Sequence, residues 1–391
     1  MPEFPSIPAA SNPDPADPVE PAPKAVLLSR RAILRQGGLL VGGIGAAAVV
    51  AGCSAAGNPN WTFAAAPLVT PGQASSPSPA PVASAPVASA PAPSATAAPA
   101  ASPSGSPAVV GHDPSPADFA VPKPFRPALK VPVEFSLTAN DGPAETIIIS
   151  ASPLQTYQSM NFDHQVPAPT LRITEGDTVH FTLTNQGQLG HSIDFHAAQT
   201  AWSKNYQEVP PGTSASFSWT ADYPGVFMYH CGTVPVLMHI GDGMYGAIVV
   251  DPKAGRAAAR EYVIVQSEFY GTGGDYAKML NSPPDYVVLN GQANRYKTAP
   301  LPAKAGELVR LFVVNAGPNS SSAFHVIGAL FSKVEASGYP ANAQGMHQTL
   351  AIPPGDGALL ELRFAEPGDY PFVTHKFSDA TKGATGVFHV T

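Results

Sequence analysis

Short runs of alternating hydrophobic and polar residues fill the chain from about Pro122 onward. Examples are Thr178–Leu183 and Glu361–Phe364, and Pro-Gly and Gly-Asp turn pairs separate such runs. A period of two places successive side chains on opposite faces of a strand. Short strands spaced by turn residues are typical of an antiparallel β-sandwich, so we predict an all-β fold.

The alternating region carries the same signals twice. Glu175–Asp177 precede a run that ends at Asn185, and Ala305–Glu307 precede a run that ends at Asn315, so both anchors recur 130 residues later. Self-similarity at this length indicates a duplicated domain rather than a solenoid. We therefore predict two domains, at residues 121–252 and 258–391.

The N-terminal third has a different composition. About half of the 45 prolines lie before residue 121, and residues 54–120 consist mainly of Ala, Pro, Ser and Gly with hardly any charge. Such a segment cannot bury enough apolar surface to offset the entropy of ordering the chain. We predict a disordered linker at residues 53–120.

The first 52 residues resemble an export signal. Ser29–Arg35 resembles the twin-arginine motif, and the uncharged stretch Gly37–Gly52 is too short and glycine-rich for a permanent transmembrane helix. Val50–Cys53 resembles a bacterial lipobox, which predicts acylation of Cys53. We expect a lipoprotein on the extracytoplasmic face of the membrane, or a periplasmic protein. The alternative is a simple membrane anchor with a chance cysteine.

Charge and cysteine content exclude two further classes. The net charge is −7, with no basic run outside the leader, which argues against a nucleic-acid partner. The two cysteines, Cys53 and Cys231, each stand in a context that gives them a role other than pairing with each other, which excludes a fold held by disulfide bonds.

One cluster combines a cysteine with two histidines and a methionine. Cys231 is followed by His239 and Met244, and His191 lies upstream. A thiolate, two imidazoles and a weak thioether form the ligand set of a trigonal type 1 copper site. We therefore predict that His191, Cys231, His239 and Met244 bind type 1 copper. The alternative is a buried structural cysteine with unrelated histidines.

A second pair of histidines is interleaved with this set. His196 lies five residues after His191, and His230 directly precedes Cys231. Because adjacent residues on a strand point to opposite faces, His230 and Cys231 are predicted to serve different sites that share one peptide link. A catalytic copper held by imidazoles needs a third histidine and an open position.

Four segments of residues 121–391 carry a recognisable pattern: His191–His196, Tyr229–Met244, Phe324–Ile327 and Thr374-His375. Together they resemble the copper-containing, nitric-oxide-forming nitrite reductases. The resemblance implies two tandem cupredoxin-like Greek-key β-sandwich domains, two coppers per chain and a homotrimer. It also implies one-electron reduction of nitrite to nitric oxide and water. The electron would pass from type 1 to type 2 copper through His230-Cys231.

The resemblance also implies roles for individual residues. The type 2 copper ligands are His196, His230 and His375. The resemblance implies that His375 arrives from a neighbouring subunit, and the residues by themselves leave binding in cis or in trans open. Asp194 and His325 are implied in proton delivery, which a carboxylate and an imidazole can share when their pKa values are suitably tuned. Ile327 is implied in shaping the nitrite pocket. The alternatives are a strand-end hydrogen-bonding role for Asp194 and a satisfied core histidine at His325.

Two other functions share parts of this pattern. A two-domain multicopper oxidase of laccase type would need several His-x-His pairs and a His-Cys-His element, whereas Gly232 follows Cys231 and no His-x-His occurs. A non-catalytic blue-copper electron carrier would need neither His196 nor His375. The electron donor is expected to be a small cupredoxin or a c-type cytochrome, and no motif distinguishes the two.

Overall fold

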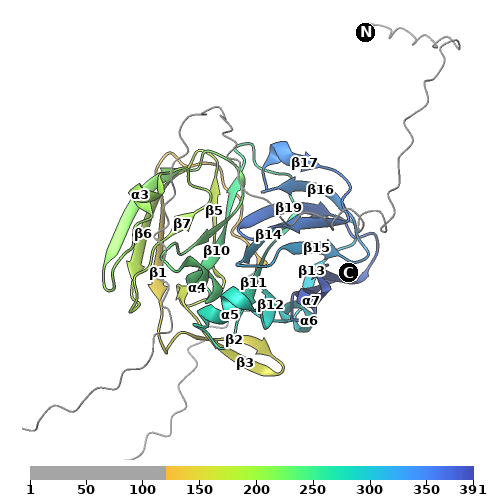
Figure 1. Ribbon diagram of the computed structural model, residues 1–391. Helices are drawn as coiled ribbons and strands as arrows, with labels where there is room; N and C mark the ends of the chain where they lie inside the picture. The colour runs from red at the N-terminus through yellow and green to blue at the C-terminus, as the bar shows by residue number, and fades with distance from the viewer. Residues whose placement is uncertain (1–119) are drawn as a thin grey trace, which may run out of the picture. The chain divides into compact units, whose positions relative to one another are not determined.

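The computed structural model describes residues 120–391, which form mostly strands (Figure 1). The predicted run Thr178–Leu183 lies in β6 (Thr178–Asn185), where buried residues alternate with more exposed ones. The run Glu361–Phe364 is strand only at its start, because β19 (Asp356–Leu362) ends where both neighbouring strands begin. The prediction of an all-β fold is confirmed.

A first sandwich consists of two four-stranded sheets with the orders β4-β1-β6-β8 and β5-β10-β9-β7. Its other strands are β1 (Val133–Asn140), β4 (Asn161–Phe162), β5 (Ala168–Thr174), β7 (Asp194–Phe195), β8 (Ser214–Thr220), β9 (Gly225–His230) and β10 (Tyr245–Asp251). Two short helices lie in its loops, α3 (Trp202–Asn205) and α4 (Val236–Gly241). The first core fills the space between the sheets and includes Leu137, Phe181, Phe195, Tyr229 and Ile248.

A second sandwich consists of a six-stranded sheet, β12-β11-β14-β19-β16-β17, and a five-stranded sheet, β13-β21-β20-β15-β18. The strands of the first sheet, besides β19, are β11 (Arg260–Phe269), β12 (Tyr286–Leu289), β14 (Val309–Gly317), β16 (Phe331–Ala336) and β17 (Ala343–Gln344). Those of the second are β13 (Leu301–Ala303), β15 (Ser322–Val326), β18 (Thr349–Ile352), β20 (Gly368–Thr374) and β21 (Thr385–Val390). The short helices are α5 (Tyr276–Asn281), α6 (Arg295–Thr298), α7 (Phe377–Ala380) and the 3₁₀ turn η1 (Pro340–Asn342).

The sequence repeat appears as a repeat of strand pairing. The pair β1–β6 is parallel, as is β11–β14, and the pair β5–β10 is parallel, as is β13–β21. The expectation of antiparallel strands alone was therefore wrong for these pairs, because the period of two is the same in both kinds of sheet. Gly176 and Gly306 stand at corresponding turns with φ of +94° and +75°, where a β-carbon would be strained.

A third group of apolar side chains, the middle core, lies where the two sandwiches meet. Tyr245, Ala247 and Val249 of β10 belong to it, whereas Ile248 and Val250 belong to the first core. Strands β11, β14 and β19 of the second sandwich supply its other side, with Val263, Val265, Phe312, Val314 and Leu359. A strand in a sheet that is covered on both faces is hydrophobic at nearly every position. Strand β10 is covered in this way, and all of its residues are buried.

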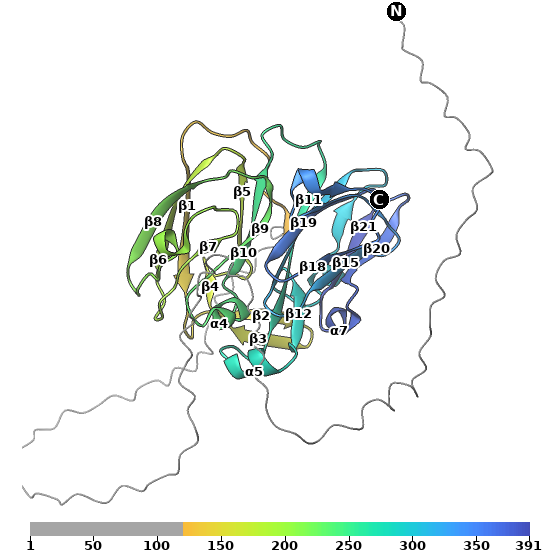
Figure 2. The same cartoon turned by 45° about the horizontal axis from the view of Figure 1, so that its top comes forward.

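A hairpin of β2 (Thr146–Ala151) and β3 (Leu154–Gln158) leaves the first sandwich and contacts the second (Figure 2). Ser150 pairs with Ala293 in an isolated bridge, and the Gln158 N–H donates to the Thr272 carbonyl. The hairpin thus joins segments far apart in the sequence. Among residues 120–391, no helix is both long and apolar enough to cross a bilayer.

Candidate metal centres

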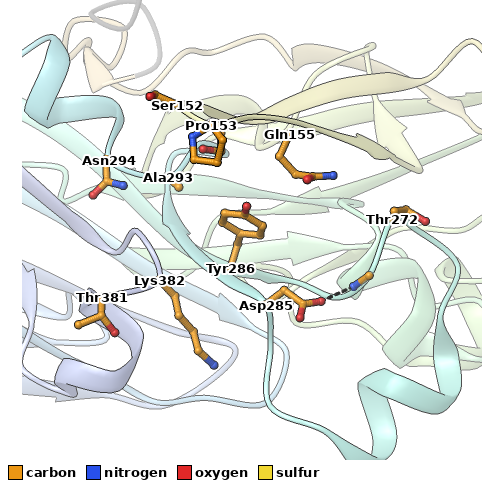
Figure 3. Close-up of a pocket in the computed structure, with 12 residues that line it drawn as sticks. Ser152, Pro153, Gln155, Thr272, Asp285, Tyr286, Ala293, Asn294, Thr381 and Lys382 are labelled. Carbon is orange, nitrogen blue, oxygen red and sulfur yellow. Dashed lines mark hydrogen bonds between the residues drawn. The ribbon is translucent and has the colours of Figure 1, made fainter.

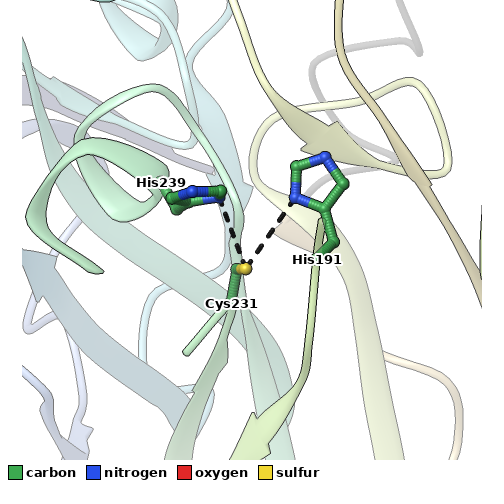
Figure 4. A group of neighbouring side chains, drawn as sticks. All are labelled: His191, Cys231 and His239. Atoms are coloured by element: carbon green, nitrogen blue, oxygen red, sulfur yellow. Dashed lines mark hydrogen bonds between the residues drawn. The ribbon is translucent and has the colours of Figure 1, made fainter. Parts of the chain in front are cut away.

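The structure brings together three of the four predicted blue-copper ligands in a buried group (Figure 4). The ligand atoms of His191, Cys231 and His239 lie within 4.8 Å of one another. Cys231 Sγ is 3.9 Å from His191 Nδ1 and 3.5 Å from His239 Nδ1. Both imidazoles therefore turn the same nitrogen toward the sulfur.

Local structure explains how these residues meet. Cys231 directly follows β9, and His239 lies in α4 on the loop that returns to β10. His191 is held by an isolated bridge to Val209. Met244, the fourth predicted ligand, is fully buried, and its carbonyl accepts the Cys231 N–H at 3.0 Å. The return loop thus fixes Met244 against the cysteine backbone.

The surroundings of the sulfur suit a soft metal ion. Burial lowers the pKa of His239 to about 4 and also lowers that of His191, so both imidazoles are neutral lone-pair donors at neutral pH. Burial raises the pKa of the Cys231 thiol, although N–H groups of Ser192 and Thr233 favour the thiolate. A thiolate here needs a cation beside it, and a donor set of one sulfur and two imidazoles fits copper.

A second group contains Asp194, His196 and His230, with one ligand atom from each within 4.8 Å of the others. His196 Nδ1 lies 2.9 Å from the Gly355 carbonyl, and His230 Nδ1 lies 2.9 Å from the Cys231 carbonyl. Because carbonyls only accept, both Nδ1 atoms carry protons and both Nε2 atoms keep their lone pairs. These Nε2 atoms are 3.1 Å apart. Two lone pairs at that distance require a shared proton or a cation, so the pair fits a metal.

The alternation of β9 separates His230 from Cys231. Val226 and Met228 belong to the middle core, whereas Tyr229 and Cys231 belong to the first core. His230 has the same parity as Val226 and Met228, so it faces the second sandwich. This geometry agrees with the prediction that His230 and Cys231 would enter different groups. Burial also lowers the pKa of His230.

The remaining predicted residues lie in the second sandwich. His375 follows β20, and its ring centroid is 5.5 Å from that of His325. His325 Nδ1 lies 2.6 Å from the Gln348 carbonyl, and Ile327 is 43% exposed. Within the described part of this single chain, the group that holds His196 and His230 does not include His375.

Two contacts at these groups carry no sequence signal. Asp141 Oδ2 lies 2.8 Å from His191 Nε2. The Gly355 carbonyl that orients His196 comes from the other sandwich. Neither follows from a motif, because each partner is distant in the sequence and only the folded topology brings it close. Cys53, the twin-arginine motif and residues 53–119 of the predicted linker lie outside the described residues.

A pocket of 590 Å³ lies elsewhere, at the β2–β3 hairpin (Figure 3). Hydroxyl and amide groups of Ser152, Gln155 and Thr272 line it, together with Lys382. Its one carboxylate, Asp285, accepts the Gly271 N–H at 2.6 Å. The lining holds no histidine or cysteine, so this pocket is not a candidate copper site.

The chain is similar to known proteins in both sequence and structure. A family model described as multicopper oxidase matches residues 145–255. A copper-containing nitrite reductase of Alcaligenes xylosoxydans is 34% identical over 258 residues, which are 58% of this chain and 77% of the relative. The solved copper nitrite reductase of Nitrosomonas europaea is 39% identical with a TM-score of 0.64, covering 67% of this chain and 94% of that one. The chain belongs to the family of copper-containing nitrite reductases.

Membership of this family confirms the resemblance and the cupredoxin-like fold class. A copper-containing nitrite reductase of Neisseria meningitidis is 39% identical over 249 residues, which are 60% of this chain. The chain spans 64% of the length of that relative. A solved multicopper oxidase is 27% identical with a TM-score of 0.62, covering 71% of this chain and 96% of that one. The fold alone therefore does not distinguish a nitrite reductase from a multicopper oxidase. That distinction depends on the residues of the metal sites.

Proposed function

We propose that this protein reduces nitrite by one electron and two protons to nitric oxide and water, using two coppers per chain. The observation that carries the proposal is the junction at His230-Cys231, where one peptide bond joins two separate donor groups. Bound copper would supply one-electron chemistry at both groups. The peptide link gives the shortest covalent path between them, which suits electron entry at one group and reduction at the other.

The ligand assignments are part of this proposal. The thiolate group, His191, Cys231 and His239 with Met244, would hold type 1 copper. His196 and His230 would hold type 2 copper through Nε2, with His375 from a neighbouring subunit as the third imidazole. A homotrimer would supply this third imidazole, because His375 of the same chain does not belong to the group of Asp194, His196 and His230.

Two side chains are suited to proton delivery. Asp194 Oδ2 lies 3.9 Å from His230 Nε2, and the Asp194 side chain is 31% exposed, so it can exchange protons with solvent beside the reaction site. His325 carries a proton on Nδ1, where the Gln348 carbonyl accepts it, which leaves Nε2 to take up and release a second proton. Ile327 would limit the space above the type 2 site.

The sequence features also support proposals about location and partners. The leader suggests export and a lipid anchor at Cys53, and the electron donor would be a soluble cupredoxin or c-type cytochrome. Multicopper oxidase activity is the second candidate, because that family model and structure match the chain. Gly232 after Cys231 and the lack of His-x-His in the sequence argue against it.

Anaerobic turnover with an artificial electron donor tests the proposal. Nitric oxide is followed with an electrode, and copper is counted per chain in the same preparation. We expect nitric oxide and two coppers per chain. One copper, a blue colour and no nitric oxide would identify an electron carrier instead, and rapid oxygen reduction without nitrite turnover would identify an oxidase.

A further inference from the structure

A buried carboxylate stands behind one imidazole of the thiolate group. Asp141 Oδ2 lies 2.8 Å from His191 Nε2, and the two side chains are 5% and 0% exposed. The ring presents its other nitrogen, Nδ1, to Cys231 Sγ. Asp141 therefore touches a proposed copper ligand on the side opposite the metal position.

The chain holds this carboxylate in place from the loop that follows β6. The backbone N–H of Gln188 donates to Asp141 Oδ1 at 2.8 Å, and that of Leu189 donates to Oδ2 at 2.9 Å. Asn185 shapes the loop, because its Nδ2 donates to the carbonyls of Leu189 and Val209 and its Oδ1 accepts the Gly187 N–H. These hydrogen bonds favour the ionised carboxylate and fix its direction.

A glycine makes the close approach possible. A β-carbon at Gly187 would lie 2.3 Å from Asp141 Oδ2 and 3.1 Å from His191 Nε2. Real β-carbons do not approach other atoms as closely as the first of these distances, so any side chain here would displace the carboxylate. The loop is thus built around the contact between Asp141 and His191.

The contact has two chemical consequences. An ionised carboxylate only accepts, so His191 must carry its proton on Nε2 and keep the Nδ1 lone pair for the metal. Oxidised copper also carries one more positive charge than reduced copper, so a fixed negative charge nearby stabilises the oxidised form.

We propose that Asp141 is a positioning residue that fixes the tautomer of His191 and lowers the reduction potential of type 1 copper. The inference rests on the type 1 assignment within the proposed function. Asp141 lies outside the proposed ligand set, and the reduction potential can be measured without nitrite turnover.

The test compares Asp141→Asn with wild type in the copper-loaded full chain by redox titration of the blue band. The amide keeps an acceptor oxygen but removes the charge. We expect the equilibrium between oxidised and reduced copper to shift about tenfold toward the reduced form, which is a rise of about 59 mV for one electron. Asp141→Glu retains the charge and should restore most of the wild-type potential.

Asp177→Asn is the matched control. Asp177 also accepts two backbone N–H groups, from Thr174 and Leu129, but it contacts no proposed ligand. We expect its potential to stay at the wild-type value. Equal potentials in Asp141→Asn and wild type would overturn the inference, as would an equal shift in both Asn variants.

A measurement on the wild type covers the case in which Asp141→Asn does not fold. In the reduced, diamagnetic protein, ¹H–¹⁵N spectra report which His191 nitrogen carries the proton. A slowly exchanging proton on Nε2 supports the inference, and a proton on Nδ1 or fast exchange with water overturns it. A shifted potential in a protein that makes no nitric oxide would support this inference while contradicting the proposed function.

Discussion

His230 and Cys231 share a peptide bond, yet their side chains belong to two separate donor groups. The period of two in β9 sends one side chain toward the second sandwich and the other into the first core. The carbonyl of Cys231 also accepts the His230 Nδ1 proton at 2.9 Å, so the cysteine backbone orients the histidine ring. A change at either residue is therefore expected to affect both groups, whereas changes at His196 or His375 should affect one.

Replacing His375 with alanine tests this separation. His375 lies in the second sandwich beside His325, and it does not belong to the thiolate group of its own chain. We expect His375→Ala to keep the thiolate charge-transfer band, to lose one copper per chain and to lose nitrite turnover. Optical spectra, copper analysis and the nitric oxide assay measure the three effects. Loss of the thiolate band in this variant would contradict the separation of the two ligand sets.

Gly355 is predicted to support the second group through its backbone. It has φ of +83°, its carbonyl accepts the His196 Nδ1 proton, and a β-carbon would lie 3.3 Å from His196 Cε1. Gly355→Ala should lower the free energy of unfolding by about 1–2 kcal/mol, because a left-handed conformation is strained for alanine. It should also weaken copper binding at His196.

Gly212 offers a matched control for that variant. It stands in the corresponding Pro-Gly turn of the first sandwich with φ of +73°, and its β-carbon would meet nothing within 4 Å. Gly212→Ala should cost a similar free energy of unfolding and leave both copper sites unchanged. Chemical denaturation and copper titration separate the two effects, and equal copper affinity in the two variants would disprove the role of Gly355.

A buried ion network joins the two sandwiches. Arg172 Nε lies 2.6 Å from Asp251 and its Nη1 lies 2.6 Å from Glu261, with 3% of the arginine side chain exposed. Arg172→Met should lower the free energy of unfolding by about 3–5 kcal/mol, because buried Asp251 loses its nearest cation and keeps Arg256 at 3.9 Å, while Glu261 keeps Arg310. Arg260→Met breaks a partly exposed pair with Glu307 and should cost about 0–1 kcal/mol. Urea unfolding of both variants measures the difference, and equal losses would contradict it.

Glu268 is predicted to make stability depend on pH. Burial raises the pKa of Glu268 above its ordinary value of 4.5. Hydrogen bonds from Tyr270 and the Ser320 N–H lower the pKa, but the effect of burial is larger. The folded protein thus holds this proton more tightly than the unfolded chain, so stability falls as pH rises from about 4.5 through the folded pKa. In the metal-free protein, Glu268→Gln should lose less stability than wild type over this range. Parallel unfolding curves at each pH test this, and a constant difference between the two proteins would contradict it.

The residue pattern predicted much of the fold, because hydrophobic and polar residues alternate with a period of two where one face of a sheet is exposed, as in β6. It could not predict which strands pair in parallel, as β1 and β6 do, because both kinds of pairing have the same period. Strands in the middle core, such as β10, are buried on both faces and carry no alternation at all.

The donor groups were predictable to a similar extent. Cys231, His239 and Met244 lie on one loop, and alternation at His230-Cys231 indicated two sets, whereas the full type 2 ligand set was implied by the resemblance. Asp141 and the Gly355 carbonyl were not predicted, because their contacts depend on loop geometry and on the packing of one sandwich against the other. His375 does not belong to the group of His196 and His230 within one chain, so its assignment as a ligand comes from the resemblance.

A single anaerobic turnover tests whether one electron passes from the type 1 copper through the type 2 site to nitrite. The type 1 copper of the full chain is reduced until the blue colour disappears, nitrite is added without further donor, and colour and nitric oxide are recorded together, with His196→Ala as the control. We expect wild type to regain its blue colour as nitric oxide forms, while His196→Ala stays colourless. A wild type that stays colourless, or a His196→Ala variant that regains colour and forms nitric oxide at the same rate, would contradict this expectation.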